Sequence, residues 1–295
     1  MVSPALFRGY DRAGLDDQYD NPAGLPDRPD YLTRWQSGAE EARARFRPEL
    51  DLAYGPGPRQ QLDVFKPSAA SGPRPPIFFY IHGGYWHRHD KTVAAHLALV
   101  FAKAGALFVA PGYSRVPEVP LARVIEDVRA ALRFTFENAE RLGGDPKRLH
   151  VGGFSAGAHL AAMLMATAWA PRGLPADVIR SVTAVSGVYD LEPLRHASLN
   201  ETLQIAEADV LTLSPVHLQP RSGAPLLLGV GGGESEEFRR QTRDLAAAWS
   251  PYLPVTVLEA AGRHHLGAQA ELEDAGSPLA AAALARLELA GPRVP

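Results

Sequence analysis

The sequence of 295 residues contains no cysteine, which excludes disulfide bonds, thiolate catalysis and zinc sites built on cysteine. The chain also has no large excess of positive or negative charge. Its formal net charge is −3, so no basic surface that would bind nucleic acid or anionic lipid is expected. No apolar run approaches the roughly 20 residues that span a bilayer. The N-terminal 30 residues lack a basic segment followed by an apolar core, so no signal peptide is expected. We therefore expect a cytoplasmic protein whose partners are neither nucleic acids nor membranes.

From residue 60 onward, short apolar runs alternate with segments of helical periodicity. Strands that are apolar on both faces and that alternate with helices predict an α/β fold, with a mainly parallel central sheet and helices on both faces. In such sheets, ligands bind outside the carboxyl ends of the strands. The predicted strands are 61–66 (an edge strand), 76–81, 106–110, 148–151, 181–185, 225–230 and 255–258, and the predicted helices are 121–142, 156–168, 235–249 and 278–289.

The first 50 residues differ from this alternating pattern. Apolar side chains recur there at helical spacing, at Tyr31, Trp35, Ala39, Ala42 and Phe46. One such helix is too short to form a domain. We therefore predict that residues 1–50 are an N-terminal lead-in packed on a main domain, which comprises residues 51–295.

The strongest local motif is G-x-S-x-G at residues 153–157, which lies between a predicted strand and a predicted helix. This context is typical of the nucleophile turn of α/β hydrolases, in which a serine stands exposed at a sharp bend. The glycines let neighbouring backbone approach the bend, and the helix N-terminus favours the negative charge of acyl transfer. The alternative is a serine that only caps a helix. The context predicts that Ser155 is the nucleophile.

A second motif, His82-Gly83-Gly84-Tyr85-Trp86, directly follows the strand predicted at 76–81. In this fold, an H-G-G segment at that place supplies backbone donors for an oxyanion hole. The predicted donors are the amides of Gly83, Gly84 and Ala156. Tyr85 and Trp86 either form an aromatic wall for the substrate or belong to the core, and the sequence leaves both open.

A base and an acid are expected in the order serine, acid, histidine. Of the ten histidines, His264 and His265 lie in the loop after the last predicted strand. For the acid, Glu234 follows the strand 225–230, and Asp190 follows the strand before it. Each carboxylate also has a purely structural reading at a helix N-terminus. Spacing alone leaves both choices open.

The chain resembles the kynurenine formamidase (arylformamidase) branch of the α/β hydrolases from about Leu15 to Leu289. The H-G-G-Y-W motif is its most specific element. The resemblance implies the α/β-hydrolase fold with His265 as the base and Glu234 as the acid. The stretches that carry it are 82–86, 117–121, 153–160, 186–191, 234–238 and 262–265.

This resemblance implies hydrolysis of an N-formyl aryl amide through an acyl-enzyme, without a cofactor, as in tryptophan catabolism. A carboxylesterase or another amidase with the same residues is the alternative, and a binding protein that keeps the fold is a third reading. The expected partner is a small aryl amide or ester, and the choice between monomer and homodimer stays open. We expect no metal site, because His82, His87 and His89 have no carboxylate at a recognised ligand spacing.

Overall fold

The computed structural model describes residues 4–19, 25–67 and 74–289. Within these residues, the strands form one sheet in the order β1-β2-β4-β3-β5-β6-β7-β8. The pairs β1–β2 and β2–β4 are antiparallel, and all the others are parallel. The strands are β1 Glu49–Ala53, β2 Gln61–Phe65, β3 Ile77–Ile81, β4 Leu107–Pro111, β5 Leu149–Phe154, β6 Ser181–Val185, β7 Leu226–Gly231 and β8 Val255–Ala260.

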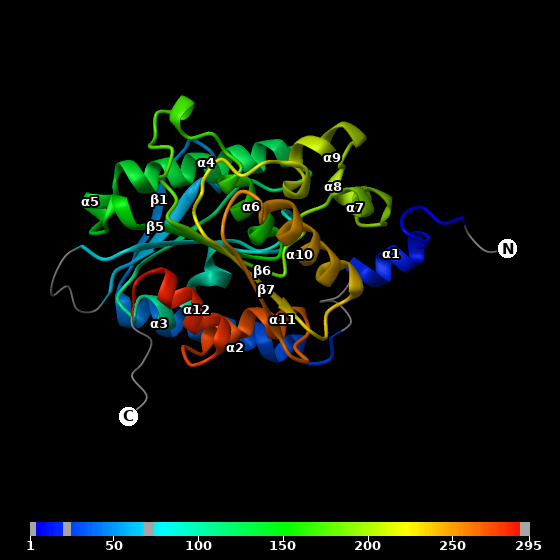
Figure 1. Cartoon of the computed structure of the whole chain (residues 1–295). Coiled ribbons are helices and arrows are strands. Elements are labelled where there is room, and N and C mark those ends of the chain that lie inside the picture. Colours follow the sequence, from blue (N-terminus) through cyan, green and yellow to red (C-terminus); the bar gives the residue numbers. More distant parts are fainter. Residues whose placement is uncertain (1–3, 20–24, 68–73, 290–295) are drawn as a thin grey trace.

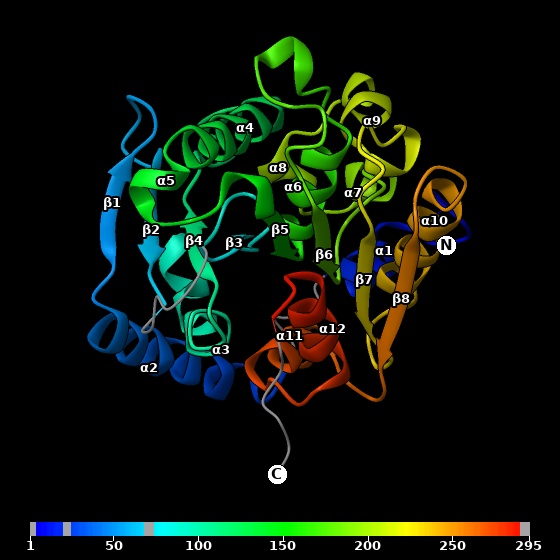
Figure 2. The ribbon, with the colours of Figure 1, turned by 60° about the vertical axis from the view of Figure 1, so that its left-hand side comes forward.

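Helices cover both faces of this sheet (Figures 1 and 2). The α-helices are α1 Arg12–Tyr19, α2 Arg28–Phe46, α3 Ala98–Phe101, α4 Leu121–Glu137, α5 Ala139–Leu142, α6 Ala156–Met165, α7 Glu192–His196, α8 Asn200–Leu203, α9 Glu207–Leu213, α10 Glu236–Trp249, α11 His265–Ala270 and α12 Pro278–Arg286. Short 3₁₀ helices are η1 Lys91–Leu97, η2 Pro146–Arg148, η3 Ala170–Arg172, η4 Pro215–His217 and η5 Glu271–Glu273. None of the helices within the described ranges is both long and apolar enough to cross a membrane.

Two apolar cores lie on opposite faces of the sheet because successive strand residues point to opposite sides. In β3, Ile77, Phe79 and Ile81 face the core formed with α4, α6 and α10, whereas Phe78 and Tyr80 face the core formed with α2, α3 and α12. All five side chains are fully buried. The predicted α/β architecture, with a mainly parallel sheet covered on both faces, is confirmed.

Several predicted elements differ from the structure. Strand β2 is not at the edge of the sheet, because β1 pairs with its outer side. Strand β1 also runs through residue 50, where the boundary between lead-in and main domain was expected. The helix predicted at 121–142 is divided into α4 and α5 at Asn138. Helices α7, α8 and α9 were not predicted, because each has no more than seven residues and no clear apolar period.

Candidate active site

Ser155 stands at a sharp turn between β5 and α6. Its backbone has φ +55° and ψ −120°, a conformation that costs energy for any residue with a side chain. A Cβ at Gly153 would overlap the carbonyl of Gly157, and a Cβ at Gly157 would overlap the carbonyl of Ile81. Both glycines of the motif are therefore required by close backbone packing around the turn.

The loop after β3 packs directly on this turn. A Cβ at Gly83 would lie 2.9 Å from the Phe154 carbonyl oxygen and 3.1 Å from the Ser155 Cβ, so only glycine fits there. Gly84 has φ +118°, which an L side chain rarely adopts. Among the described residues, the amides of Gly83, Gly84 and Ala156 donate to no protein acceptor. Three backbone donors are thus available beside the serine.

His265 is held between a carboxylate and two aromatic rings. Its Nδ1 lies 2.7 Å from Oε2 of Glu234, and its ring centroid lies 4.6 Å from that of Phe154 and 4.5 Å from that of Phe238. The side chains of His265 and Glu234 are almost completely buried. The second oxygen of Glu234 accepts hydrogen bonds from the Ser186 hydroxyl and from the Gly231 amide. A buried carboxylate with all these partners is fixed in position.

The two residues that competed for these places have other contacts. His264 is the N-cap of α11, where its Nδ1 accepts from the Gly267 amide, and its Nε2 lies 3.0 Å from Oδ2 of Asp27. His264 therefore has a structural place at the start of α11 and does not contact Glu234. Asp190 accepts from the Glu192 amide and forms an ion pair of 3.2 Å with Arg240.

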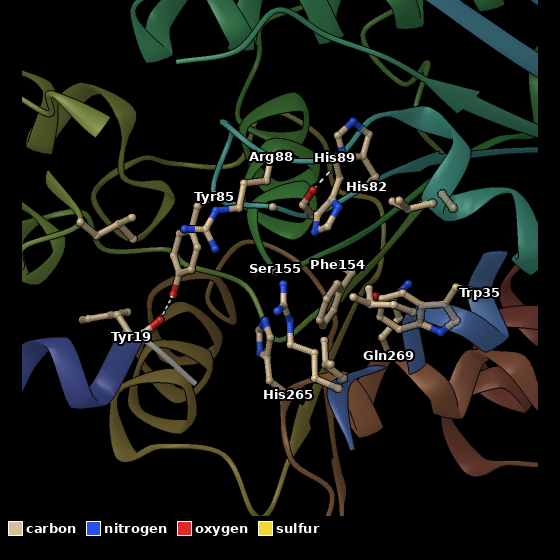
Figure 3. A pocket seen from close by; sticks show the side chains of 18 of the residues that line it. Tyr19, Trp35, His82, Tyr85, Arg88, His89, Phe154, Ser155, His265 and Gln269 are labelled. Carbon is tan, nitrogen blue, oxygen red and sulfur yellow. Dashed lines mark hydrogen bonds between the residues drawn. The ribbon is translucent and has the colours of Figure 1, made fainter. Parts of the chain in front are cut away.

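Ser155 and His265 line one cavity of about 360 Å³. Figure 3 shows Ser155 and His265 between two sides of the cavity, with Tyr19 and Tyr85 on one side and Trp35 and Gln269 on the other. The residues that line it are Asp16, Tyr19, Arg28, Leu32, Trp35, His82, Gly83, Gly84, Tyr85, Arg88, His89, Val93, Ala94, Phe154, Ser155, Ser198, Leu199, His265, Leu266 and Gln269.

A family model named BD-FAE matches residues 62–211, slightly more than half of the chain. The kynurenine formamidase of Danio rerio is 32% identical over 219 residues, which cover 72% of this chain and 73% of that protein. The protein of the same name from Salmo salar is also 32% identical over 219 residues, which cover 72% of each chain. The chain belongs to the BD-FAE family of α/β hydrolases. The resemblance to kynurenine formamidases that the motifs predicted is confirmed.

Several other similar proteins and structures are named as esterases. Esterase LipQ of Mycobacterium tuberculosis is 36% identical over 149 residues, which cover 48% of this chain and 35% of that protein. The crystal structure of a proposed thioesterase from a Silicibacter species has a TM-score of 0.79 at 32% identity and covers 90% of this chain and 97% of its own. Esterase B of Lactobacillus rhamnosis has a TM-score of 0.68 at 21% identity, covers 90% of this chain and 95% of its own, and supports the fold alone.

The two aromatic residues of the H-G-G-Y-W motif have different surroundings in the structure. Tyr85 lines the cavity, and its hydroxyl donates to the Tyr19 carbonyl oxygen at 2.6 Å. Trp86 is fully buried outside the cavity, with its ring edge-on to His159 at 4.9 Å. Both residues have positive φ, and their rings stay in edge-on contact with centroids 6.3 Å apart, but only Tyr85 reaches the cavity. Of the two roles that the sequence left open for Trp86, the structure therefore favours the core and not an aromatic wall for the substrate.

His82 packs against the loop that contains Gly83 and Gly84. Its ring stacks on Tyr113 at 4.3 Å, and its Nδ1 lies 2.7 Å from the Gly83 carbonyl oxygen. Burial lowers the pKa of His82 to about 4, so the ring is neutral near pH 7. Among the described residues, no group of three or more histidine, aspartate or glutamate side chains is placed to hold a metal ion.

Sequence reasoning missed a large part of the cavity wall in this BD-FAE chain. Five lining residues come from α1 and α2, in the segment predicted only to pack on the main domain: Asp16, Tyr19, Arg28, Leu32 and Trp35. The apolar period of α2 marks which face is buried but not that its N-terminal turns reach the site. Ser186, which binds Glu234, was likewise missed, because a serine after a strand has no distinctive pattern.

Proposed function

We propose that this BD-FAE hydrolase cleaves N-formyl aryl amides of the N-formylkynurenine type to an arylamine and formate. The main support is the contact between Glu234 and His265 in the cavity that Ser155 also lines. The formyl amide is supported by the similarity to kynurenine formamidases over 72% of the chain. The apolar side of the cavity, with Leu32, Trp35 and Phe154, offers space for an aromatic ring.

In this mechanism, the Ser155 hydroxyl attacks the formyl carbon while His265 takes its proton. Glu234 binds the Nδ1 side of His265, so Nε2 is the nitrogen that exchanges protons. The amides of Gly83, Gly84 and Ala156 stabilise the negative charge on the carbonyl oxygen, and each such donor is worth a factor of about 10²–10³ in rate. His265 then gives the proton to the leaving arylamine. Water hydrolyses the formyl ester of Ser155 and releases formate.

Ser155→Ala tests the nucleophile. It should lower kcat for an N-formyl anilide by about 10³-fold or more, because the variant keeps the cavity but forms no acyl-enzyme. A fluorophosphonate probe should label the wild type and leave the variant unlabelled. Turnover near the wild-type value in Ser155→Ala would exclude this mechanism.

A second candidate function is a carboxylesterase with the same residues, which is favoured by the esterases among the relatives. The acyl group distinguishes the two. A site shaped for formyl should cleave N-formyl anilides about 10- to 200-fold faster than N-acetyl anilides, the discrimination that one extra carbon permits. Equal kcat/KM for formyl and butyryl anilides, or activity confined to p-nitrophenyl esters, would favour the carboxylesterase.

A further inference from the structure

Two arginines line the cavity that contains Ser155 and His265. Arg28 is the first residue of α2, and Arg88 follows the H-G-G-Y-W motif. In Figure 3, the Arg88 side chain lies beside Tyr85 on the wall of the cavity. These two segments are 60 residues apart in sequence, and the fold brings both of them to one cavity.

Neither guanidinium forms an ion pair with a carboxylate of the described residues, although arginines elsewhere on the same helix and in the main domain do. Arg34, on the same helix, binds Glu273 at 2.7 Å, and Arg240 binds Glu237 at 2.8 Å. The one acidic residue among those that line the cavity, Asp16, accepts from the amide and the hydroxyl of Ser198 at 2.7 and 2.6 Å. The cavity thus has two guanidinium groups with unused donors.

The position of Arg28 is not explained by the stability of its helix. A cation in the first turn of a helix is opposed by the helix dipole, which favours anions there. His89 also lines the cavity. Burial lowers the pKa of His89, and the positive charges of Arg28 and Arg88 lower it further. Asp90 acts in the opposite direction but does not reverse the shift, so the charges of the two arginines reach this part of the cavity.

We infer that Arg28 and Arg88 form a subsite for a carboxylate of the substrate and determine its specificity. A guanidinium presents donors in a planar fork that matches a carboxylate. The inference rests on the proposed function in one respect: a formyl group carries no substituent, so the carboxylate must belong to the arylamine. The substrate would place its ring against the apolar side of the cavity and its carboxylate against the arginines.

The test compares two formanilides of nearly equal shape, one with a propanoate side chain and one with the corresponding propanamide. For the wild type, kcat/KM should be about tenfold higher for the acid, a factor typical of hydrogen bonds to a charged group. Arg28→Gln and Arg88→Gln should each remove most of this preference through a higher KM for the acid. Their kcat/KM should fall much less for the amide than for the acid.

Arg133→Gln is the matched control, because Arg133 is exposed on α4 and lies outside the cavity. It should keep the preference for the acid. A rise in ionic strength should lower kcat/KM for the acid and leave kcat/KM for the amide unchanged, because salt screens the attraction between exposed charges. Equal kcat/KM of the wild type for acid and amide, or an equal loss of preference in Arg133→Gln, would overturn the carboxylate subsite.

Calorimetric binding of both compounds to Ser155→Ala separates this inference from the proposed function. Tighter binding of the acid that Arg28→Gln or Arg88→Gln abolishes would support the subsite, even if the wild type hydrolysed neither compound and the formamidase activity were thereby excluded. Equal binding of acid and amide, together with hydrolysis of both by the wild type, would leave the proposed function intact and overturn the subsite.

Discussion

His265 has very little freedom to rotate. Glu234 binds its Nδ1, and the rings of Phe154 and Phe238 pack on its two sides. A carboxylate at Nδ1 favours the tautomer with a proton there, which leaves the lone pair on Nε2. The side chains around His265 therefore prepare one nitrogen for proton transfer, and the adjacent His264 lacks these contacts.

His265→Ala and His264→Ala should differ sharply in activity. Loss of His265 should lower kcat about as much as loss of Ser155, because the two act as a unit. Loss of His264 should leave kcat within about tenfold and lower the free energy of unfolding by about 0.5–2 kcal/mol, the usual cost of a lost helix cap. Steady-state kinetics and urea unfolding of both variants measure this contrast, and a larger loss of kcat in His264→Ala would contradict the assignment.

Glu234→Gln and Asp190→Asn should separate catalysis from stability. Glu234→Gln should lower kcat by about 10²–10⁴-fold, because a misdirected imidazole cannot accept the serine proton. Asp190→Asn should instead lower the free energy of unfolding by roughly 1–3 kcal/mol, because it weakens the buried contact with Arg240. If the folded Asp190→Asn protein had the larger loss of kcat, Asp190 would be the acid.

Helix α2 joins the cavity wall to the rest of the molecule. Trp35 lines the cavity, stacks on His96 of η1 at 5.4 Å and donates from Nε1 to Glu273 at 2.5 Å. Ala42 of the same helix is fully buried. Helix α2 packs closely on η1 at Gly38, where an added Cβ would lie 2.9 Å from the His96 Cβ.

Gly38→Ala should therefore destabilise the protein, although the same change in an exposed helix interior stabilises it by about 1 kcal/mol. The new methyl group would push α2 away from η1, at a cost of about 1–3 kcal/mol in the free energy of unfolding. Ser37→Ala, at an exposed position of the same helix, is the control and should be neutral or slightly stabilising. Urea unfolding measures both, and a more stable Gly38→Ala protein would show that α2 does not pack closely on η1.

Buried neutral histidines are distributed through the molecule. Burial lowers the pKa of each to about 4, and they are His82, His96, His150 and His159. In the unfolded chain, these rings are free to take up a proton near the ordinary pKa of about 6.5. Protonation on the acid side therefore favours the unfolded state.

The free energy of unfolding should fall as the pH is lowered from about 6.5 towards 4. The sign follows from proton uptake: the unfolded state binds more protons than the folded state in this window, so stability rises with pH. Each such histidine should account for about 1 kcal/mol of the loss between pH 7 and 5.5. His150→Asn should reduce the loss by about that amount, whereas the exposed His217→Asn should not change it. Equal losses in the wild type and His150→Asn would contradict this linkage.

The sequence by itself determined the class of fold and the place of the candidate site. Strand and helix periods, together with G-x-S-x-G and H-G-G, are local patterns, and close backbone packing around Ser155 requires the glycines in them. Ligands bind at the carboxyl ends of parallel strands, so these motifs also located the site. The choice of Glu234 and His265 needed the family resemblance, because spacing alone left Asp190 and His264 open.

Only the tertiary structure decided which other side chains face the cavity. Trp86 and Tyr85 are adjacent in sequence and both have positive φ, yet only Tyr85 lines the cavity, whereas Trp86 is fully buried outside it. Trp35 takes its place through contacts with His96 and Glu273, which are distant in the chain. Apolar periodicity indicates which face of a helix or strand is buried, but not which residues pack against that face. The cavity wall is therefore a property of the folded chain, whereas the sharp turn at Ser155 is already specified by five consecutive residues.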